Sequence, residues 1–203
     1  MTISLTGPMG SGKSSVGRKL SALLAGMCKP ENKDGRVCLL DLDDYIVIRS
    51  GRTIPEIFAA DGESGFRAVE TKCLEEVLDW SDGKQTSEEA VKALPQVKKP
   101  DVLVLSLGGG AVIKNSELIH DRTICVFLIA SIDTLVDRLD GRTANRPLLA
   151  AESRDSLKAK VEGILEARKS LYEKAARFVL NTDGMSVTEA AQEVIRLLSG
   201  RQD

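Results

Sequence analysis

A glycine-rich segment near the N-terminus has the residue types and the spacing that bind phosphate. Residues 7–14, GPMGSGKS, satisfy the pattern G-x-x-x-x-G-K-[ST]. Glycines let successive backbone N–H groups line a concave nest around phosphate oxygens, where side chains would intrude. In this pattern Lys13 reaches the β- and γ-phosphates of a nucleoside triphosphate, and the Ser14 hydroxyl ligates Mg²⁺. The predicted nucleotide-binding residues are Gly10, Ser11, Gly12, Lys13, Ser14 and Ser15.

Two aspartates follow the second apolar run of the chain. Asp41 and Asp43 come at the end of a strand expected at 37–40. Ligands of an open parallel sheet bind beyond the carboxyl ends of the strands, so both acids should face the phosphate side. One can orient water molecules on Mg²⁺, and the other can accept a proton from an acceptor hydroxyl. Asp44 is a third candidate. The phosphate loop alone leaves GTPase, ATPase and kinase open, and the acids help to choose a kinase.

Short apolar runs alternate with longer helical patterns, which predicts βαβ units and a parallel sheet covered by helices on both faces. Strands are expected at 3–6, 37–40, 102–107, 124–129 and 178–180. Helices are expected at 12–25, 55–59, 65–78, 132–139, 157–176 and 187–198. We therefore predict an α/β fold in a single domain over residues 1–203. Polar residues at about 81–100 predict a surface excursion, in which 87–94 could form a short helix.

Composition excludes several classes of function. A net charge of −2 and 3% aromatic residues provide neither a basic face nor stacking platforms, so nucleic acid is not an expected partner. No apolar run is long enough to span a bilayer, and the N-terminus has a strand pattern, so we expect no membrane partner and a cytoplasmic location. His120 is the single histidine, which excludes a histidine-built zinc site and a histidine triad. The 4 cysteines are scattered and are interpreted as reduced thiols.

Further motifs follow one another along most of the chain. They are 41–46 (DLDDYI), 54–58 (IPEIF), Phe66-Arg67 with Glu70, the triplet Gly108–Gly110, 142–149 (RTANRPLL) and 168–175 (RKSLYEKA). In this order they resemble the shikimate kinase family. The resemblance implies a three-layer P-loop kinase fold with a five-stranded parallel sheet and a lid at about 140–155. It also implies ATP- and Mg²⁺-dependent phosphorylation of the 3-hydroxyl of shikimate to shikimate 3-phosphate, a step of chorismate and aromatic amino acid biosynthesis.

The resemblance also implies roles for individual residues. Asp43 matches the acid that contacts the acceptor hydroxyls and acts as catalytic base, and Asp41 matches the acid that reaches Mg²⁺ through water. Arg67 and Arg168 match the pair that binds the substrate carboxylate, which suits the bidentate, permanently charged guanidinium group. Glu70 lies three residues after Arg67 on the same helix face, where it could orient that arginine or touch a hydroxyl.

The glycine triplet and the lid complete the implied site. Gly109 would let the substrate ring approach the backbone, with Gly108 and Gly110 on either side. Arg146 in the lid would neutralise charge on the γ-phosphate in the transition state, as a catalytic and substrate-binding residue. Arg142 would stack on adenine. Shikimate is the expected partner, and we expect a monomer.

Two other functions fit part of the pattern. A gluconate or nucleoside-monophosphate kinase would share the phosphate loop and an early acid, but not Phe66-Arg67, the glycine triplet and the Arg168 motif. A catalytically silent module that binds nucleotide or shikimate would be expected to lose Lys13, Asp43 or an anchoring arginine, and all of them are present.

Overall fold

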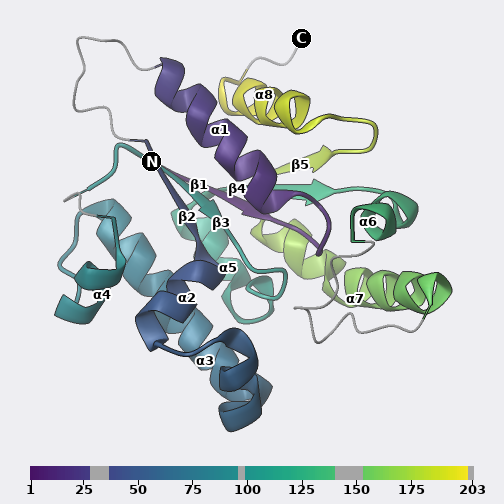
Figure 1. Cartoon of the computed structure of the whole chain (residues 1–203). Coiled ribbons are helices and arrows are strands. Elements are labelled where there is room, and N and C mark those ends of the chain that lie inside the picture. Colours follow the sequence, from purple (N-terminus) through teal and green to yellow (C-terminus); the bar gives the residue numbers. More distant parts are fainter. Residues whose placement is uncertain (28–36, 96–98, 140–152, 201–203) are drawn as a thin grey trace.

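Five short apolar segments form the parallel sheet that the alternating pattern predicts. A computed structural model of the chain describes residues 1–27, 37–95, 99–139 and 153–200. The strands are β1 (Thr2–Thr6), β2 (Val37–Asp41), β3 (Val102–Ser106), β4 (Ile124–Ile129) and β5 (Phe178–Asn181). All pairs are parallel, in the order β2-β3-β1-β4-β5 (Figure 1). The predicted α/β fold with a five-stranded parallel sheet is therefore confirmed.

Alternate residues of the central strands point to opposite faces of the sheet, as the strand period of two requires. Val104 of β3 packs in one hydrophobic cluster, and its neighbours Leu103 and Leu105 pack in another. The covering helices are α1 (Lys13–Met27) and α8 (Val187–Leu198) on the first face, and α5 (Val112–Arg122) and α7 (Arg154–Ala175) on the second (Figure 1). Both faces are thus buried, which gives the predicted three layers. Most of the lid expected at 140–155 lies outside the described residues.

Two helices lie where no helix is expected from the sequence, α5 and α2 (Leu42–Ser50). Asp41 caps the start of α2, because its carboxylate accepts a hydrogen bond from the Asp43 N–H at 3.1 Å. Gly51 ends the helix with a left-handed φ of 67°. The acids expected at the end of this strand are therefore the cap and the first turn of a helix, which fixes the direction of the Asp43 side chain.

The helices expected at 55–59 and 65–78 are two parts of one element, α3 (Ile54–Asp82). The parts meet at Gly62, whose φ of 68° and ψ of −176° are non-helical and favour glycine. The kink explains why the helical pattern appears interrupted. The second part carries Arg67 on its buried side.

The segment at about 81–100, which the sequence predicts to be a surface excursion, is mostly exposed where it is described but also contributes buried residues. Ser81 is buried in the last turn of α3, and a short helix forms as expected at α4 (Glu88–Ala93). Ala90 and Leu94 lie four residues apart on one face of this helical turn, and both are buried in the larger core cluster. The abundant charged residues around them hide this apolar pair in the sequence.

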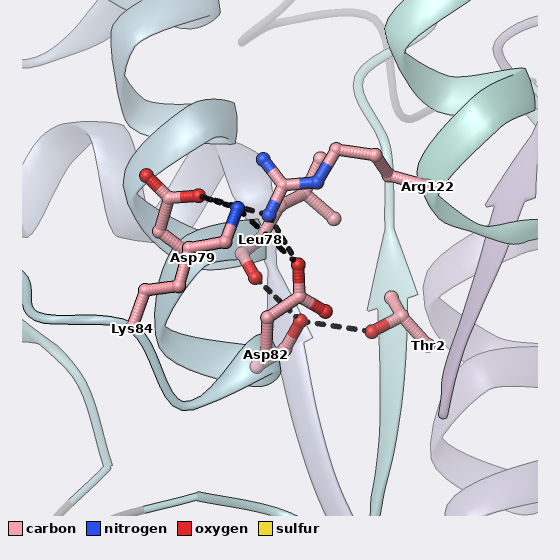
Figure 2. A network of polar contacts seen from close by, with 7 residues as sticks. Thr2, Leu78, Asp79, Asp82, Lys84 and Arg122 are labelled. Atoms are coloured by element: carbon pink, nitrogen blue, oxygen red, sulfur yellow. Dashed lines mark hydrogen bonds and ion pairs between the residues drawn. The ribbon is translucent and has the colours of Figure 1, made fainter.

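A network of polar contacts ties the C-terminal end of α3 to the sheet (Figure 2). Arg122, at the end of α5, donates to Asp79 at 2.9 Å and to Asp82 at 2.5 Å. Thr2 of β1 donates to the Ser81 hydroxyl at 3.0 Å. The ion pairs are half-exposed and each contributes only about 0–1 kcal/mol, but together the contacts join α3, α5 and β1. The helix that carries Arg67 is therefore anchored at its far end.

Two of the cysteines lie in the protein interior. Cys73 and Cys125 are buried, and burial raises the pKa of each thiol to about 12, so both stay protonated and unreactive. Cys28 lies outside the described residues. Within the described ranges, no helix has both the length and the apolar composition that a bilayer crossing needs.

Candidate active site

One cavity opens at the carboxyl edge of the sheet, with a volume of about 640 Å³. Every predicted site residue in the described part of the chain lines it. These residues are Gly10, Ser11, Gly12, Lys13, Ser14, Ser15, Asp41, Asp43, Arg67, Gly108, Gly109, Gly110 and Arg168. Arg142 and Arg146 lie outside the described residues and stay predictions. Asp44, the third acidic candidate, is exposed and does not line the cavity.

The phosphate loop has a backbone that only glycine allows. Gly7, Gly10 and Gly12 have φ values of 142°, 84° and 91°. A Cβ on Gly7 would lie 2.2 Å from the Leu128 carbonyl oxygen, so a side chain there is excluded. Lys13 donates from Nζ to the carbonyls of Gly7 and Pro8, each at 2.9 Å, which places its ammonium group within the loop.

The loop fits an anionic phosphate chain. It precedes the N-terminus of α1, where unpaired N–H groups and the helix dipole favour negative charge. The buried Ser11 Oγ has no hydrogen-bond partner among the described residues, so a buried polar atom is left for a ligand.

Two side chains offer hard oxygen ligands beside the loop. Ser14 Oγ donates to Asp41 Oδ2 at 2.7 Å and lies 3.3 Å from Ser106 Oγ. Oxygen donors suit Mg²⁺, which usually takes one or two protein ligands and completes its shell with phosphate and water. The described residues contain no group of three or more acidic, histidine or cysteine ligands that could hold a metal without a nucleotide. The donor set therefore fits a Mg²⁺ ion shared with a nucleotide.

Asp43 has the electrostatic properties of a group that can accept a proton. Burial and the carboxylates of Asp41 and Asp44 raise the pKa of Asp43 to about 6, although Lys13 and Arg67 act in the opposite direction. A pKa near the operating pH suits a general base.

Arg67 reaches the cavity from α3 as a buried cation. It is 6% exposed, donates from Nη1 to Glu70 Oε2 at 2.7 Å, and lies 3.4 Å from Glu63 Oε1. Its buried Nε has no hydrogen-bond partner in the described ranges, so the group has donor capacity left for an anion. A Cβ on Gly110 would lie 2.3 Å from Arg67 Nη2, so the guanidinium group needs glycine at that position.

Glu70 accompanies Arg67 in the interior. It is 1% exposed, and burial raises the pKa of its carboxyl group, while Arg67 lowers it. The sequence left open whether Glu70 orients the arginine or touches a hydroxyl. The ion pair with Arg67 is the contact that the structure contains, and Glu70 also lines the cavity.

Arg168 reaches the same place from α7. Its Nη1 donates to the Gly109 carbonyl at 3.2 Å. The glycine triplet therefore lies between two guanidinium groups that are carried by two different helices.

Arg138 is a cavity residue that the sequence analysis misses. It lies in the last turn of α6 (Ile132–Leu139), and its guanidinium group donates to Thr182 Oγ1 at 3.0 Å and to Thr182 O at 2.9 Å. The planar group is thus fixed on the side of the cavity formed by the segment after β5. A signal was available in the sequence, because the short helix expected at 132–139 directly follows the strand expected at 124–129 and therefore starts at the carboxyl edge of the sheet. The adenine contact was instead assigned to Arg142.

These features define a class of protein. A phosphate loop after β1, a helix-capping acid at the end of β2 and a cavity over the carboxyl edge of a parallel sheet in the order 2-3-1-4-5 are the parts of a P-loop kinase that acts on a small molecule.

Comparisons with known proteins identify the family. A sequence model of the family described as "Shikimate kinase" matches residues 9–85 and 84–199, so the chain belongs to the shikimate kinase family. Shikimate kinase from Acinetobacter baumannii is 35% identical over 198 residues, which are 97% of this chain and 91% of the relative. Shikimate kinase from Rhodococcus erythropolis is 33% identical over 201 residues, which are 98% of this chain and 96% of the relative.

Solved structures agree with the sequence relatives. Shikimate kinase from Acinetobacter baumannii in complex with shikimate superposes with a TM-score of 0.76 at 33% identity, covering 100% of this chain and 95% of that one. Shikimate kinase from Bacteroides thetaiotaomicron superposes with a TM-score of 0.77 at 29% identity, covering 98% of each chain. The family predicted from the ordered motifs is confirmed.

Proposed function

We propose that this chain transfers the γ-phosphoryl group of ATP to the 3-hydroxyl of shikimate and forms shikimate 3-phosphate, with Mg²⁺ as cofactor. Membership of the shikimate kinase family supports the activity. Within chorismate and aromatic amino acid biosynthesis, the product would be the phosphorylated acid that later steps consume.

One observation carries the proposal. Arg67 and Arg168 reach a single glycine triplet from two helices, and Asp43 and the phosphate loop line the same cavity. Two guanidinium groups suit a planar carboxylate, since each can donate two hydrogen bonds and neither loses its charge. An acceptor held there by its carboxylate would present ring hydroxyls toward Asp43.

The chain's own residues then perform the transfer. Asp43 accepts the proton of the attacking hydroxyl as its oxygen bonds to the γ-phosphorus and the bond to the ADP oxygen breaks. Lys13 and the loop N–H groups stabilise the negative charge on the phosphoryl oxygens. Ser14 and Asp41 would hold Mg²⁺, which supplies further charge neutralisation when it is bound.

An assay that couples ADP formation to a measured signal tests the substrate. With ATP and Mg²⁺, shikimate should support turnover, while gluconate and AMP should give rates no higher than the background without an acceptor. A Lys13→Ala variant is the control for contaminating kinases. Turnover with gluconate or AMP but not with shikimate would contradict the proposal. Phosphorus and proton NMR of the product would show whether the phosphate is on the 3-hydroxyl.

Replacing either anchoring arginine by lysine should weaken shikimate binding selectively. We expect Arg67→Lys and Arg168→Lys each to raise the KM for shikimate by about 10- to 100-fold, with the KM for ATP changed less than about threefold, because a lysine cannot bind a carboxylate in a bidentate manner. Arg196→Lys, on the exposed surface of α8, is the matched control. An equal rise in the KM for ATP would show that the arginines do not bind the acceptor.

A further inference from the structure

The hydroxyl of Tyr172 points at the backbone of the glycine triplet. Tyr172 is fully buried in α7, and its ring stacks on Phe127 of β4 with centroids 4.9 Å apart. The ring is therefore part of the core. Its hydroxyl, however, donates to the Gly109 carbonyl oxygen at 2.5 Å. Tyr172 does not itself line the cavity, so it acts on the site only through its neighbours.

The Gly109 carbonyl oxygen accepts two hydrogen bonds, from the Tyr172 hydroxyl and from Arg168 Nη1. A carbonyl oxygen has two lone pairs, so both donors can be satisfied at once. Arg168 and Tyr172 are four residues apart on α7 and therefore lie on the same face of the helix. One oxygen atom thus joins the wall of the cavity, an anchoring arginine and the aromatic core.

We propose that Tyr172 is a positioning residue for substrate binding, because its hydroxyl fixes the Gly109 peptide and, through the shared carbonyl, the Arg168 guanidinium group. This inference rests on the proposed function, in which Arg168 binds the shikimate carboxylate.

The physical need for such a residue lies in the glycine itself. Gly109 has no side chain to hold its peptide plane, and even a Cβ there would make only ordinary van der Waals contacts, the nearest at 3.5 Å and 3.8 Å. The absence of a side chain lets a substrate ring lie against the Gly109 peptide. It also leaves the plane of this peptide free to tilt. Burial raises the pKa of Tyr172 to about 12, so the hydroxyl remains a donor across the pH range in which a kinase works. A stiff aromatic ring that is carried by α7 and stacked on Phe127 of β4 holds that donor in place better than a flexible side chain would.

Tyr172→Phe removes the hydroxyl and keeps the ring. We expect the KM for shikimate to rise about tenfold, while kcat and the KM for ATP change less than about threefold, because a contact that is equal in the ground and transition states affects binding alone. The Tm should fall by a few degrees, since a buried hydrogen bond is lost.

The chain offers a matched control in its second tyrosine. Tyr45 is 2% exposed, and its hydroxyl donates to Glu76 at 3.0 Å, away from the cavity residues. Tyr45→Phe should lower the Tm by a similar amount and leave the KM for shikimate within about twofold of wild type. A purely structural role for Tyr172 predicts the same result for both variants, and that result would overturn the inference.

A double-mutant cycle tests the route through Arg168. In an Arg168→Lys background, Tyr172→Phe should raise the KM for shikimate by less than about threefold, because the shared carbonyl no longer orients a guanidinium group. An undiminished tenfold rise would overturn the claim that Tyr172 acts through Arg168. Wild-type protein without shikimate turnover would refute the proposed function instead, so the two failures are distinguishable.

Discussion

The Asp43→Asn variant is expected to lose roughly 10²- to 10⁴-fold in kcat while it remains folded, because asparagine keeps the shape of the side chain but cannot accept the proton of the attacking hydroxyl. Asp43 lines the cavity beside Lys13, and the N–H of Asp43 itself is bound to the carboxylate of Asp41. The substitution leaves that backbone contact intact. Steady-state rates with saturating ATP and shikimate would measure the loss.

Asp44→Asn is the control for this substitution. Asp44 is in the same first turn of α2, but it is exposed and lies outside the cavity. Its loss should leave kcat within about twofold of wild type, a small effect typical of surface positions. Near-normal turnover in Asp43→Asn would show that Asp43 orients the acceptor without deprotonating it, as a largely electrostatic phosphoryl transfer would allow.

The pKa of Asp43 also sets a pH dependence. Since burial and Asp41 raise this pKa to about 6, kcat/KM of the wild type should rise with pH through that value as the base ionises. The residual activity of Asp43→Asn should lack this rise in kcat/KM near pH 6. If the rise persists in the variant, it reports the ionisation of another group.

The substitution Asp43→Asn should raise the stability of the protein at neutral to alkaline pH, although it lowers kcat. The folded state holds the Asp43 proton up to about pH 6, whereas an ordinary aspartate carboxyl group loses it near pH 3.8. The folded protein therefore binds more protons between these values, and its stability falls as pH rises through this window. Asp43→Asn avoids that loss, so it should be more stable than wild type at pH 8 by about 1–3 kcal/mol, with no difference below pH 4. Denaturant unfolding at the two pH values measures the gap.

Elements and site residues could be predicted from the sequence where their chemistry requires a local pattern of residues. The phosphate loop needs glycine, lysine and serine at fixed spacing after a strand, so the sequence assigns Lys13 and Ser14 to one site, and both line the cavity. The five strands were found because strands of a covered parallel sheet are largely apolar, although Ser4 interrupts the run in β1. Arg67 and Arg168, in contrast, were found through the ordered family motifs, since an isolated arginine carries no local signal.

The remaining features depend on tertiary contacts that leave little trace in the sequence. The helix α2 begins with an acid that serves both as cap and as cavity residue, so its first turn resembles a polar loop. Ala90 and Leu94 are buried by packing against distant parts of the chain. Tyr172 looks like any core aromatic residue until the position of the Gly109 carbonyl is known. For Ala90, Leu94 and Tyr172 the informative partner is far away in the sequence.

Substitutions in the glycine triplet should have the second large effect. Gly110 is required by the packing of the protein itself, whereas Gly109 is required by the approach of the substrate. A Cβ on Gly110 would lie 2.3 Å from Arg67 Nη2 and 2.6 Å from both Cζ and Nη1. Arg67 cannot move away cheaply, because it is buried and its partner Glu70 is 1% exposed. Displacing one member of a buried ion pair leaves an uncompensated charge, which costs about 3–5 kcal/mol when the pair is fully broken.

Gly110→Ala should therefore lower the Tm by several degrees and raise the KM for shikimate more than about 100-fold, since it displaces the arginine that would bind the carboxylate. Gly110 has no positive φ, so alanine suits its backbone and the effect is steric. Gly109→Ala is the contrasting variant, because its Cβ would meet only contacts of 3.5 Å or more. It should keep the wild-type Tm and raise only the KM, as expected if the bound ring approaches that backbone.

A second substitution identifies the colliding group. In the double variant with Gly110→Ala and Arg67→Lys, the lysine lacks the guanidinium atoms that the new methyl group meets, yet keeps a positive charge beside Glu70. The Tm should recover toward that of Arg67→Lys alone, while the KM for shikimate stays high because bidentate binding of the carboxylate is lost. If the Tm does not recover, the strain lies elsewhere in the triplet. If it does, the absence of a side chain at Gly110 and the position of Arg67 form one structural requirement.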